Sequence, residues 1–310
     1  MPSKWSLLFH LTPGLFVFLA TLFGFVVGSF LNVIIYRLPK MLFASWKKEA
    51  VSFLSEEAPT LLAAGVGPKT IEAPDGLNPT KTDRFNLAFP ASHCPHCHHP
   101  IRYYDNIPVL SFLLLRGKCR DCQAPIHWRY PLVEAISGLL TGFVAYHFGF
   151  SPQAFAAILL TWVLLVQTFI DLEHQILLDD LTLPTLWIGL LLSLHPVFAM
   201  PEDCILGAVL GYSVFWLFAA IGQWVLKKEA MGNGDFKLLA LLGAWLGWKA
   251  LPTIILLASI GGSLIGLFLI WFRGHPKHKP IPFGPFLTVA GWIALIWNDK
   301  MVSWWLNLLS

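Results

Sequence analysis

Long apolar segments constrain the fold of this chain more than any other feature. About 20 apolar residues cross a bilayer as a helix, and eight apolar segments can be drawn along the 310 residues. They are 14–36, 131–149, 153–171, 183–199, 204–226, 236–250, 252–272 and 284–306. A hydrophobic content of 56% with only 13% charged residues excludes an ordinary soluble domain. We therefore predict an all-α polytopic membrane protein with about eight transmembrane helices.

The stretch between the first two apolar segments differs from the rest of the chain. Residues 38–130 hold 11 of the 21 Lys and Arg residues and four of the five cysteines. This stretch reads as a soluble insertion, which divides the chain into a first transmembrane helix (1–37), a Cys-rich insertion (38–130) and a membrane domain (131–310). Because the first apolar segment lacks a small-residue cleavage site, we expect a retained helix and not a signal peptide.

The positions of the basic residues predict an orientation in the membrane. With the insertion in the cytoplasm, the connections alternate so that the other basic clusters also lie inside: Lys227, Lys228, Arg273, Lys277 and Lys279. This arrangement satisfies the positive-inside rule. It places both termini outside, and it places Asp171 and Asp235 at the cytoplasmic ends of their helices.

The insertion contains two C-x-x-C pairs, Cys94/Cys97 and Cys119/Cys122, separated by 21 residues. This spacing is close to that of two zinc knuckles, and four thiolates in a tetrahedron suit Zn²⁺ without leaving a position for substrate. We therefore predict a structural zinc site in a zinc-ribbon-like insertion. Four neighbouring histidines are alternative ligands, although we expect them on the surface: His93, His96, His98 and His99. No role is predicted for Cys204.

Two carboxylates lie at the edges of apolar segments, where an ionisable side chain is costly and usually functional. Asp171 directly follows an acid-free apolar run, and Asp235 follows Gly232 and Gly234 in a G-x-G-D motif. If the two acids face each other, they share a proton, and such a pair can activate water and protonate a leaving amine. The alternatives are that Asp171 caps or solvates a helix end and that Asp235 is the N-cap of the next helix.

Several classes of protease are excluded by their motifs. The chain has no H-E-x-x-H for a catalytic zinc and no G-x-S-x-G for a serine nucleophile. Taken together, its motifs resemble those of the prepilin peptidases, membrane aspartic proteases of the G-x-G-D kind. The resemblance rests on these stretches, in order: 28–33, 36–39, the two C-x-x-C pairs, 106–108, 116–119, 130–134, Asp171 and 232–239. It implies that Asp171 and Asp235 are the catalytic pair.

The resemblance also implies what the enzyme acts on. Members of this family cleave the leaders of type IV prepilins and type II secretion pseudopilins at the cytoplasmic face of the bacterial inner membrane. Members with the Cys-rich insertion also N-methylate the new N-terminus with S-adenosyl-L-methionine, and Gly117 and Lys118 are candidates for binding this cofactor. Lipid is the other expected partner and nucleic acid is not expected, while the oligomeric state stays open. The alternatives are a transporter or channel that uses the two acids as an ion or proton site, and a peptidase without methyltransferase activity.

Overall fold

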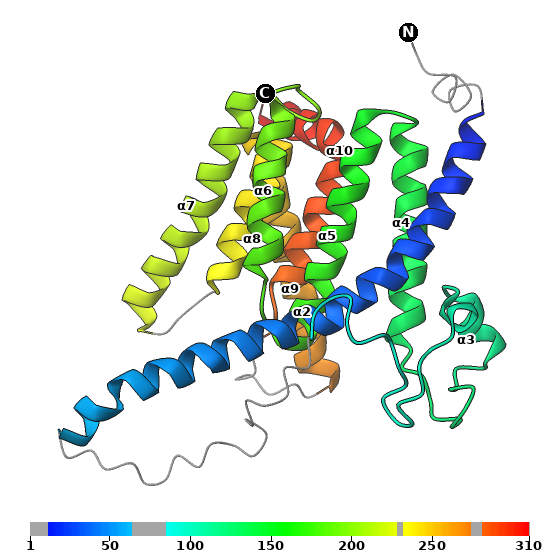
Figure 1. Cartoon of the computed structure of the whole chain (residues 1–310). Helices are drawn as coiled ribbons and strands as arrows, with labels where there is room; N and C mark the ends of the chain where they lie inside the picture. Colours follow the sequence, from blue (N-terminus) through cyan, green and yellow to red (C-terminus); the bar gives the residue numbers. More distant parts are fainter. Residues whose placement is uncertain (1–11, 64–84, 228–231, 274–280, 310) are drawn as a thin grey trace.

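The computed structural model describes residues 12–63, 85–227, 232–273 and 281–309, and within these ranges the chain is helical without strands (Figure 1). Lys228, Lys277 and Lys279 lie outside the described residues. The elements are α2 (Pro13–Ala63), η1 (Tyr103–Asn106), α3 (Leu110–Leu114), α4 (Arg129–Phe148), α5 (Pro152–His174), α6 (Asp179–Ser193), α7 (Pro201–Leu226), α8 (Asn233–Leu246), η2 (Trp248–Ala250), α9 (Leu251–Arg273) and α10 (Gly284–Leu309).

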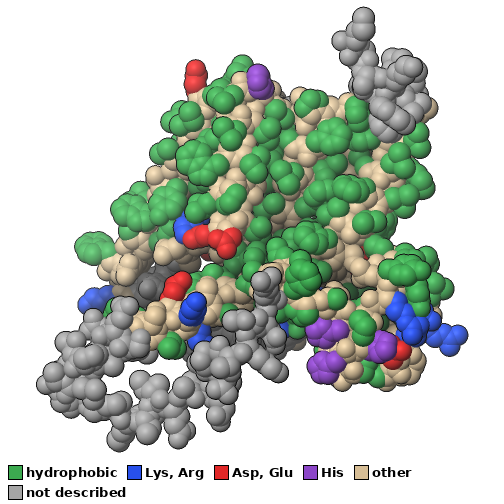
Figure 2. Space-filling model, in the orientation of Figure 1, with side chains coloured by type: hydrophobic (Ala, Val, Ile, Leu, Met, Phe, Trp, Pro, Cys, Tyr) green, Lys and Arg blue, Asp and Glu red, His purple; other side chains and the backbone are tan. Residues whose placement is uncertain are grey.

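The predicted membrane fold is confirmed, because each of the eight predicted segments overlaps one of these helices. Five spans are long and apolar enough to cross a membrane: Pro13–Phe53, Arg129–Phe148, Pro152–His174, Pro201–Val225 and Trp248–Phe272. The apolar part of α10, Gly284–Asn298, is shorter, and α6 and α8 have 15 and 14 residues. In Figure 2, hydrophobic side chains cover the helix bundle, while charged side chains gather mainly toward its lower end.

The prediction that the first helix ends near Pro39 is wrong. α2 continues through this proline for a total of 51 residues and bends as it passes below the bundle (Figure 1). A proline inside a helix removes one hydrogen bond and usually bends the helix, but tertiary contacts can hold both sides together. Beyond Pro39, Leu42 packs on the cluster that joins α2, α4 and α5, and the Phe43 ring lies 5.9 Å from that of His174 at the end of α5.

α8 lies at the centre of the bundle, and almost all of its side chains are buried. It is short because the backbone turns at Gly247, whose positive φ of 79° favours glycine. Gly207 on α7 and Gly243 on α8 pack against each other, because a Cβ atom on either glycine would collide with the backbone of the other. This close packing lets α7 cover one side of α8 along its length.

The insertion is attached to α2 by a buried arginine. Arg37 is 6% exposed and donates hydrogen bonds to the carbonyl oxygens of Asn86 (2.9 Å), Leu87 (3.3 Å) and Pro90 (2.6 Å). These contacts hold the segment before the first cysteine pair against the middle of α2. The expected helix around 45–57 is present as the continuation of α2, and residues 64–84 of the insertion lie outside the described residues.

Candidate active site and metal centre

Asp171 lies in the last turn of α5, where the helix is about to end. Its backbone carbonyl accepts a hydrogen bond from Gln175 (2.9 Å), which has a positive φ of 56° and terminates the helix. The Asp171 side chain is only 5% exposed, so it does not merely solvate the helix end. Its carboxylate accepts a hydrogen bond from the backbone N–H of Gly284 at the start of α10.

Asp235 lies in the first turn of α8. The helix begins at Asn233 with Gly232 as its N-cap, so the alternative reading of Asp235 as the N-cap is wrong. The side chain is 9% exposed. The helix dipole favours an acid in the first turn, but a solvent-exposed acid would interact with the dipole equally well. The helix dipole therefore does not explain why the Asp235 side chain is buried.

The fold brings the two predicted acids together. The C-terminal end of α5 and the N-terminal end of α8 lie at the same end of the bundle, and the two carboxylates are close enough for the charge of Asp171 to act on Asp235. Leu177, in the connection from α5 to α6, packs against the glycines beside the two acids: its side chain lies against both Gly234 and Gly284. Glycine at both positions leaves room for this contact.

A buried glutamine fixes the connection that carries Leu177. Gln167 lies one helical turn before Asp171 and is fully buried. Its side-chain oxygen accepts the N–H of Leu178 (3.1 Å), and its amide nitrogen donates to the Leu178 carbonyl (3.1 Å) and the Thr182 hydroxyl (2.6 Å). The start of α6 is therefore held to the α5 face next to Asp171. At the surface, Lys237 pairs with Asp179 (2.6 Å) and ties α8 to the start of α6.

A cavity of about 310 Å³ lies beside this end of the bundle, between α9 and the segment that enters α10. Its lining is mixed: Ser259, Gly262, Ser263, Ile281, Pro282, Phe283 and Phe286. Phe283 is adjacent to Gly284, which donates to Asp171. The cavity thus provides space with polar and apolar walls next to one of the two acids.

The four predicted cysteines form one cluster, in which the sulfur atoms of Cys94, Cys97, Cys119 and Cys122 all lie within 4.8 Å of one another. The Sγ atoms of Cys94 and Cys122 are 3.8 Å apart. A tetrahedral zinc with Zn–S bonds of about 2.3 Å needs S···S separations of about 3.8 Å, so the donor set and its geometry fit zinc. The four neighbouring histidines are exposed and do not belong to the cluster, as predicted.

The two cysteine pairs have the same local fold. In each, the residue four positions after the first cysteine has a positive φ (His98, 57°; Gln123, 58°) and donates its N–H to the carbonyl of that cysteine. Backbone N–H groups of Cys97 and His96 point at the first thiol and lower the pKa of Cys94 to about 6. The first knuckle therefore favours the thiolate form of Cys94, the form that binds metal.

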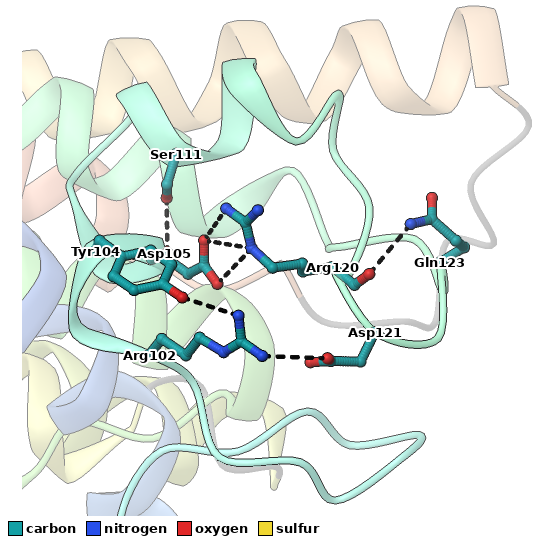
Figure 3. Close-up of polar contacts among 7 residues, drawn as sticks. All are labelled: Arg102, Tyr104, Asp105, Ser111, Arg120, Asp121 and Gln123. Atoms are coloured by element: carbon teal, nitrogen blue, oxygen red, sulfur yellow. Dashed lines mark hydrogen bonds and ion pairs between the residues drawn. The ribbon is translucent and has the colours of Figure 1, made fainter.

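Charged side chains connect the second knuckle to η1 (Figure 3). Arg120 forms a two-pronged ion pair with Asp105, with nitrogen–oxygen distances of 2.6 and 3.0 Å, and this guanidinium lowers the pKa of the Asp105 carboxyl. Arg102 donates to the Tyr104 hydroxyl (2.8 Å) and lies 3.9 Å from Asp121. Ser111 at the start of α3 donates to the Asp105 carbonyl. The network joins the stretch between the two knuckles to the second knuckle.

Gly117 and Lys118 are placed at the entrance of the second knuckle. Gly117 has a positive φ of 70° and packs on the Phe112 ring, and its carbonyl accepts the N–H of Ile126 (2.7 Å). Lys118 forms the β-bridge with Pro125 that closes the knuckle. Both positions are accounted for by the fold of the knuckle, and neither lies beside Asp171 or Asp235.

Comparison with known proteins identifies the family. The model of the bacterial peptidase A24 N-terminal domain matches residues 22–148, and that of the type IV leader peptidase family matches residues 158–267. A prepilin leader peptidase/N-methyltransferase from Stutzerimonas stutzeri is 48% identical over 299 residues, which cover 95% of each chain. The chain belongs to the type IV leader peptidase family.

Other members of the type IV leader peptidase family are similarly close. Proteins with the same name from Aeromonas hydrophila and Neisseria gonorrhoeae are 47% and 43% identical, and the matches cover 96% and 93% of this chain and 96% and 94% of theirs. No solved structure matches the chain. The transporter alternative finds no support in these comparisons, and the predicted resemblance is confirmed.

Two residues of the site were not predicted from the sequence. Gln167 is a polar residue four positions before Asp171 in an apolar run, and this spacing on one helix face is the signal that could have identified it. Gly284 lies between Phe283 and Pro285 at the start of the last apolar segment. Its contact with Asp171 depends on how α10 meets α5, which the sequence pattern does not reveal.

Proposed function

We propose that Asp171 and Asp235 are the catalytic carboxylates with which this chain cleaves the leader peptides of type IV prepilins. The observation that carries the proposal is the pairing of two buried acids, from α5 and α8, at one end of an apolar bundle. Buried carboxylates without cationic partners are costly, and in membrane proteins they usually serve function. The names of the relatives, prepilin leader peptidase/N-methyltransferase, support the same activity.

The arrangement supports general acid–base hydrolysis. One aspartate, in its ionised form, takes a proton from a water molecule that attacks the scissile carbonyl carbon. The other, in its protonated form, donates a hydrogen bond to the carbonyl oxygen and then a proton to the leaving amine. The Gly284 N–H holds the Asp171 carboxylate in place from the α10 side. Glycines at 232 and 234 leave space for a peptide backbone to approach Asp235.

We also propose that the chain N-methylates the N-terminus that cleavage exposes. The methyl group would come from S-adenosyl-L-methionine, as the name of the relatives implies. We assign no residue to this donor, because the knuckle fold accounts for Gly117 and Lys118. Pseudopilins of type II secretion, whose N-termini have the same chemistry, are proposed as further substrates.

The metal in the cysteine cluster is proposed to be one structural Zn²⁺. Four thiolates complete its coordination, so it has no position for substrate. Cys94, Cys97, Cys119 and Cys122 would hold it, and it would stabilise a part of the chain that has few buried apolar residues. It takes no part in cleavage of the leader.

The site is proposed to face the cytoplasm from the bacterial inner membrane. The insertion, the basic residues Lys227 and Arg273, and the ends of α5 and α8 would then lie on that side. In this orientation the hydrophobic stem of a prepilin lies in the bilayer beside the bundle, and its polar leader stays at the surface, where the scissile bond reaches the two acids.

The test is a mass measurement of products. Purified protein is incubated with a prepilin, with and without S-adenosyl-L-methionine. We expect the mature peptide without the donor, and the mature peptide with one added methyl group when the donor is present. An unmethylated product in both reactions would identify a peptidase without methyltransferase activity. An uncleaved prepilin in both would overturn the proposed function.

A further inference from the structure

A third buried carboxylate, in addition to the aspartate pair, lies where α2 crosses α4. Glu134, in the second turn of α4, is 9% exposed, and its Oε2 accepts the N–H of Val109 (2.8 Å). No Lys, Arg or His of the described residues lies within ion-pair distance of it. Burying a carboxylate without a cation costs several kcal/mol, so a cation that binds here would offset a cost that the fold alone leaves uncompensated.

An unpartnered oxygen lies at the same crossing. Asn32 is 4% exposed, and its side-chain nitrogen donates to the carbonyls of Tyr130 (3.0 Å) and Gly28 (3.4 Å). These two acceptors fix the amide, because a flipped amide would turn its oxygen toward both carbonyls. The Asn32 Oδ1 atom is buried and has no hydrogen-bond partner among the described residues. Such an atom usually marks a missing donor.

The crossing keeps these groups together. A Cβ atom on Gly28 would lie 2.7 Å from the Glu134 Cα, so the two backbones are in contact at this point. The Ser29 hydroxyl is within hydrogen-bonding range of the Glu134 carboxylate and donates to the Asn106 Oδ1 (3.3 Å). Asn106 is exposed, and the cluster therefore reaches the surface through it. We call Ser29, Asn32 and Glu134 the acceptor cluster, because each offers an oxygen acceptor.

The acceptor cluster lies within about one helical turn of the depth of Asp171 along the bundle. Val133 and Ile170, which precede Glu134 and Asp171, are both fully buried in one apolar cluster. The ends of the two helices are joined by the Arg129–Glu173 ion pair (2.6 Å). At 1.5 Å per residue, Glu134 lies about 7.5 Å along α4 from this pair. By the same measure, Asp171 lies about 3 Å along α5 from Glu173, the member of the pair on that helix.

We infer that the acceptor cluster binds an ammonium group, and that this group is the α-ammonium of the peptide N-terminus that leader cleavage exposes. An ammonium carries one positive charge and three donors, which matches one carboxylate and neighbouring oxygen acceptors. The inference rests on the proposed methyltransferase activity. It also makes Glu134 the proton acceptor of methylation. One proton passes from the ammonium nitrogen to a Glu134 oxygen, which leaves a neutral amine. The lone pair of this amine would form the new N–C bond while the C–S bond of the donor breaks. The sulfonium of the donor would leave as a neutral thioether, and the positive charge would pass to the methylated nitrogen.

The test compares two peptides that differ only at the N-terminus. Both have the sequence of a mature prepilin N-terminus, and one is acetylated so that it carries no charge. Wild-type full-length protein in lipid nanodiscs is expected to bind the free-amine peptide at least about tenfold more tightly. Glu134→Gln keeps an oxygen that can accept from Val109 but removes the charge, so this preference should fall to about twofold or less. Asn32→Ala, a second variant that lies on α2 and not on α4, should also reduce the preference for the free-amine peptide.

Controls separate this inference from loss of the fold and from failure of the proposed function. Glu202→Gln makes the same chemical change at an exposed position in the first turn of α7 and should leave the preference unchanged. Metal content should be normal in the Glu134→Gln variant, and prepilin cleavage should be normal in the Glu202→Gln control. Peptide binding needs no turnover, so it is measured even if wild-type protein fails to methylate.

The methyl donor also carries an ammonium group, and its affinity is therefore measured separately. We expect Glu134→Gln to leave the dissociation constant of S-adenosyl-L-methionine unchanged. A variant that binds this donor more weakly but still prefers the free-amine peptide would overturn the assignment to the peptide. Equal binding of both peptides by the wild-type protein would overturn the inference as a whole.

Discussion

At the residue scale, the site depends on small side chains that let a buried acid be approached closely. Gly284 donates its N–H to the Asp171 carboxylate, and the space that a Cβ atom would need there is already filled by the carboxylate itself. Leu177 fills the remaining space between Gly234 and Gly284. The position of Asp171 is therefore set by the absence of a side chain at 284 as much as by α5.

Gly284→Ala should strongly reduce leader cleavage. The added methyl group collides with the Asp171 carboxylate and displaces either the acid or the start of α10, and such displacements cost an order of magnitude or more in rate. We expect single-turnover cleavage to fall at least about tenfold, equivalent to about 1.4 kcal/mol.

Gly266→Ala is the matched control for this change. Among the described residues, a Cβ atom at this position of α9 would meet only the Ile281 side chain, at an ordinary contact distance of 3.7 Å. The control should cleave at close to the wild-type rate. Full activity of the Gly284→Ala variant would show that the contact between Gly284 and Asp171 has no part in positioning the acid.

The sequence could identify the residues whose type is unusual for their surroundings. Asp171 and Asp235 are conspicuous because charge is costly beside apolar runs, and the four cysteines because their spacing is specific. Gln167 and Gly284 are not conspicuous: glutamine and glycine are both tolerated in membrane helices. Their roles arise from contacts between elements, α5 with α6 and α5 with α10, which periodicity does not encode.

At the element scale, the knuckles are two short turns that need support from outside themselves. The Asp105–Arg120 pair supplies part of it, because it joins η1 to the second knuckle. Since Arg120 lowers the pKa of Asp105, the pair stabilises the fold at neutral pH, above the ordinary pKa of an aspartate, and this stabilisation is lost as the pH falls through the lowered pKa.

Asp105→Asn should therefore speed the release of metal at neutral pH. Metal analysis of the wild-type protein should give about one zinc per chain, and a colorimetric chelator reports its release over time. We expect faster release from the Asp105→Asn variant. Adding Arg120→Gln to the Asp105→Asn variant should increase the rate of metal release little further, because either change breaks the same ion pair.

Asp121→Asn is the control for the zinc experiment, because Asp121 makes only one longer contact, 3.9 Å from Arg102. It should release zinc at about the wild-type rate. Identical release from the wild-type and Asp105→Asn proteins would mean that the ion pair does not support the knuckle.

α2 shows where prediction of elements from the sequence fails. The apolar run ends near residue 36 and Pro39 follows, which is the usual signal for the end of a helix. The helix continues because the residues after the proline have partners elsewhere: Leu42 packs on α4 and α5, and Phe43 contacts His174. The segments of α4, α5, α7 and α9 are predicted to within about three residues at each end, because the length needed to cross a bilayer limits a spanning helix.

At the scale of the whole molecule, the charge distribution predicts one orientation. The insertion, the C-terminal end of α5 and the N-terminal end of α8 lie at one end of the bundle. Labelling a single exposed position in the insertion therefore shows on which side of the membrane the active site lies. We expect a cysteine at Asn86, in a variant of otherwise normal activity, to react with a membrane-impermeant reagent only after the cytoplasmic side is opened. Labelling in intact cells from the outside would invert the proposed topology.

The central claim is that Asp171 and Asp235 act together as the acid–base pair of leader cleavage. The most direct test is single-turnover cleavage of a synthetic prepilin by the Asp171→Asn and Asp235→Asn variants, each with normal zinc content and normal folding. Asparagine keeps the size and hydrogen bonding of aspartate but carries no transferable proton. We expect each variant to lose cleavage and the double variant to lose no more, because the residues act as a unit. Methylation of a cleaved peptide should survive. A folded variant that keeps more than about a hundredth of the wild-type rate, a loss below about 2.7 kcal/mol, would contradict the proposed mechanism.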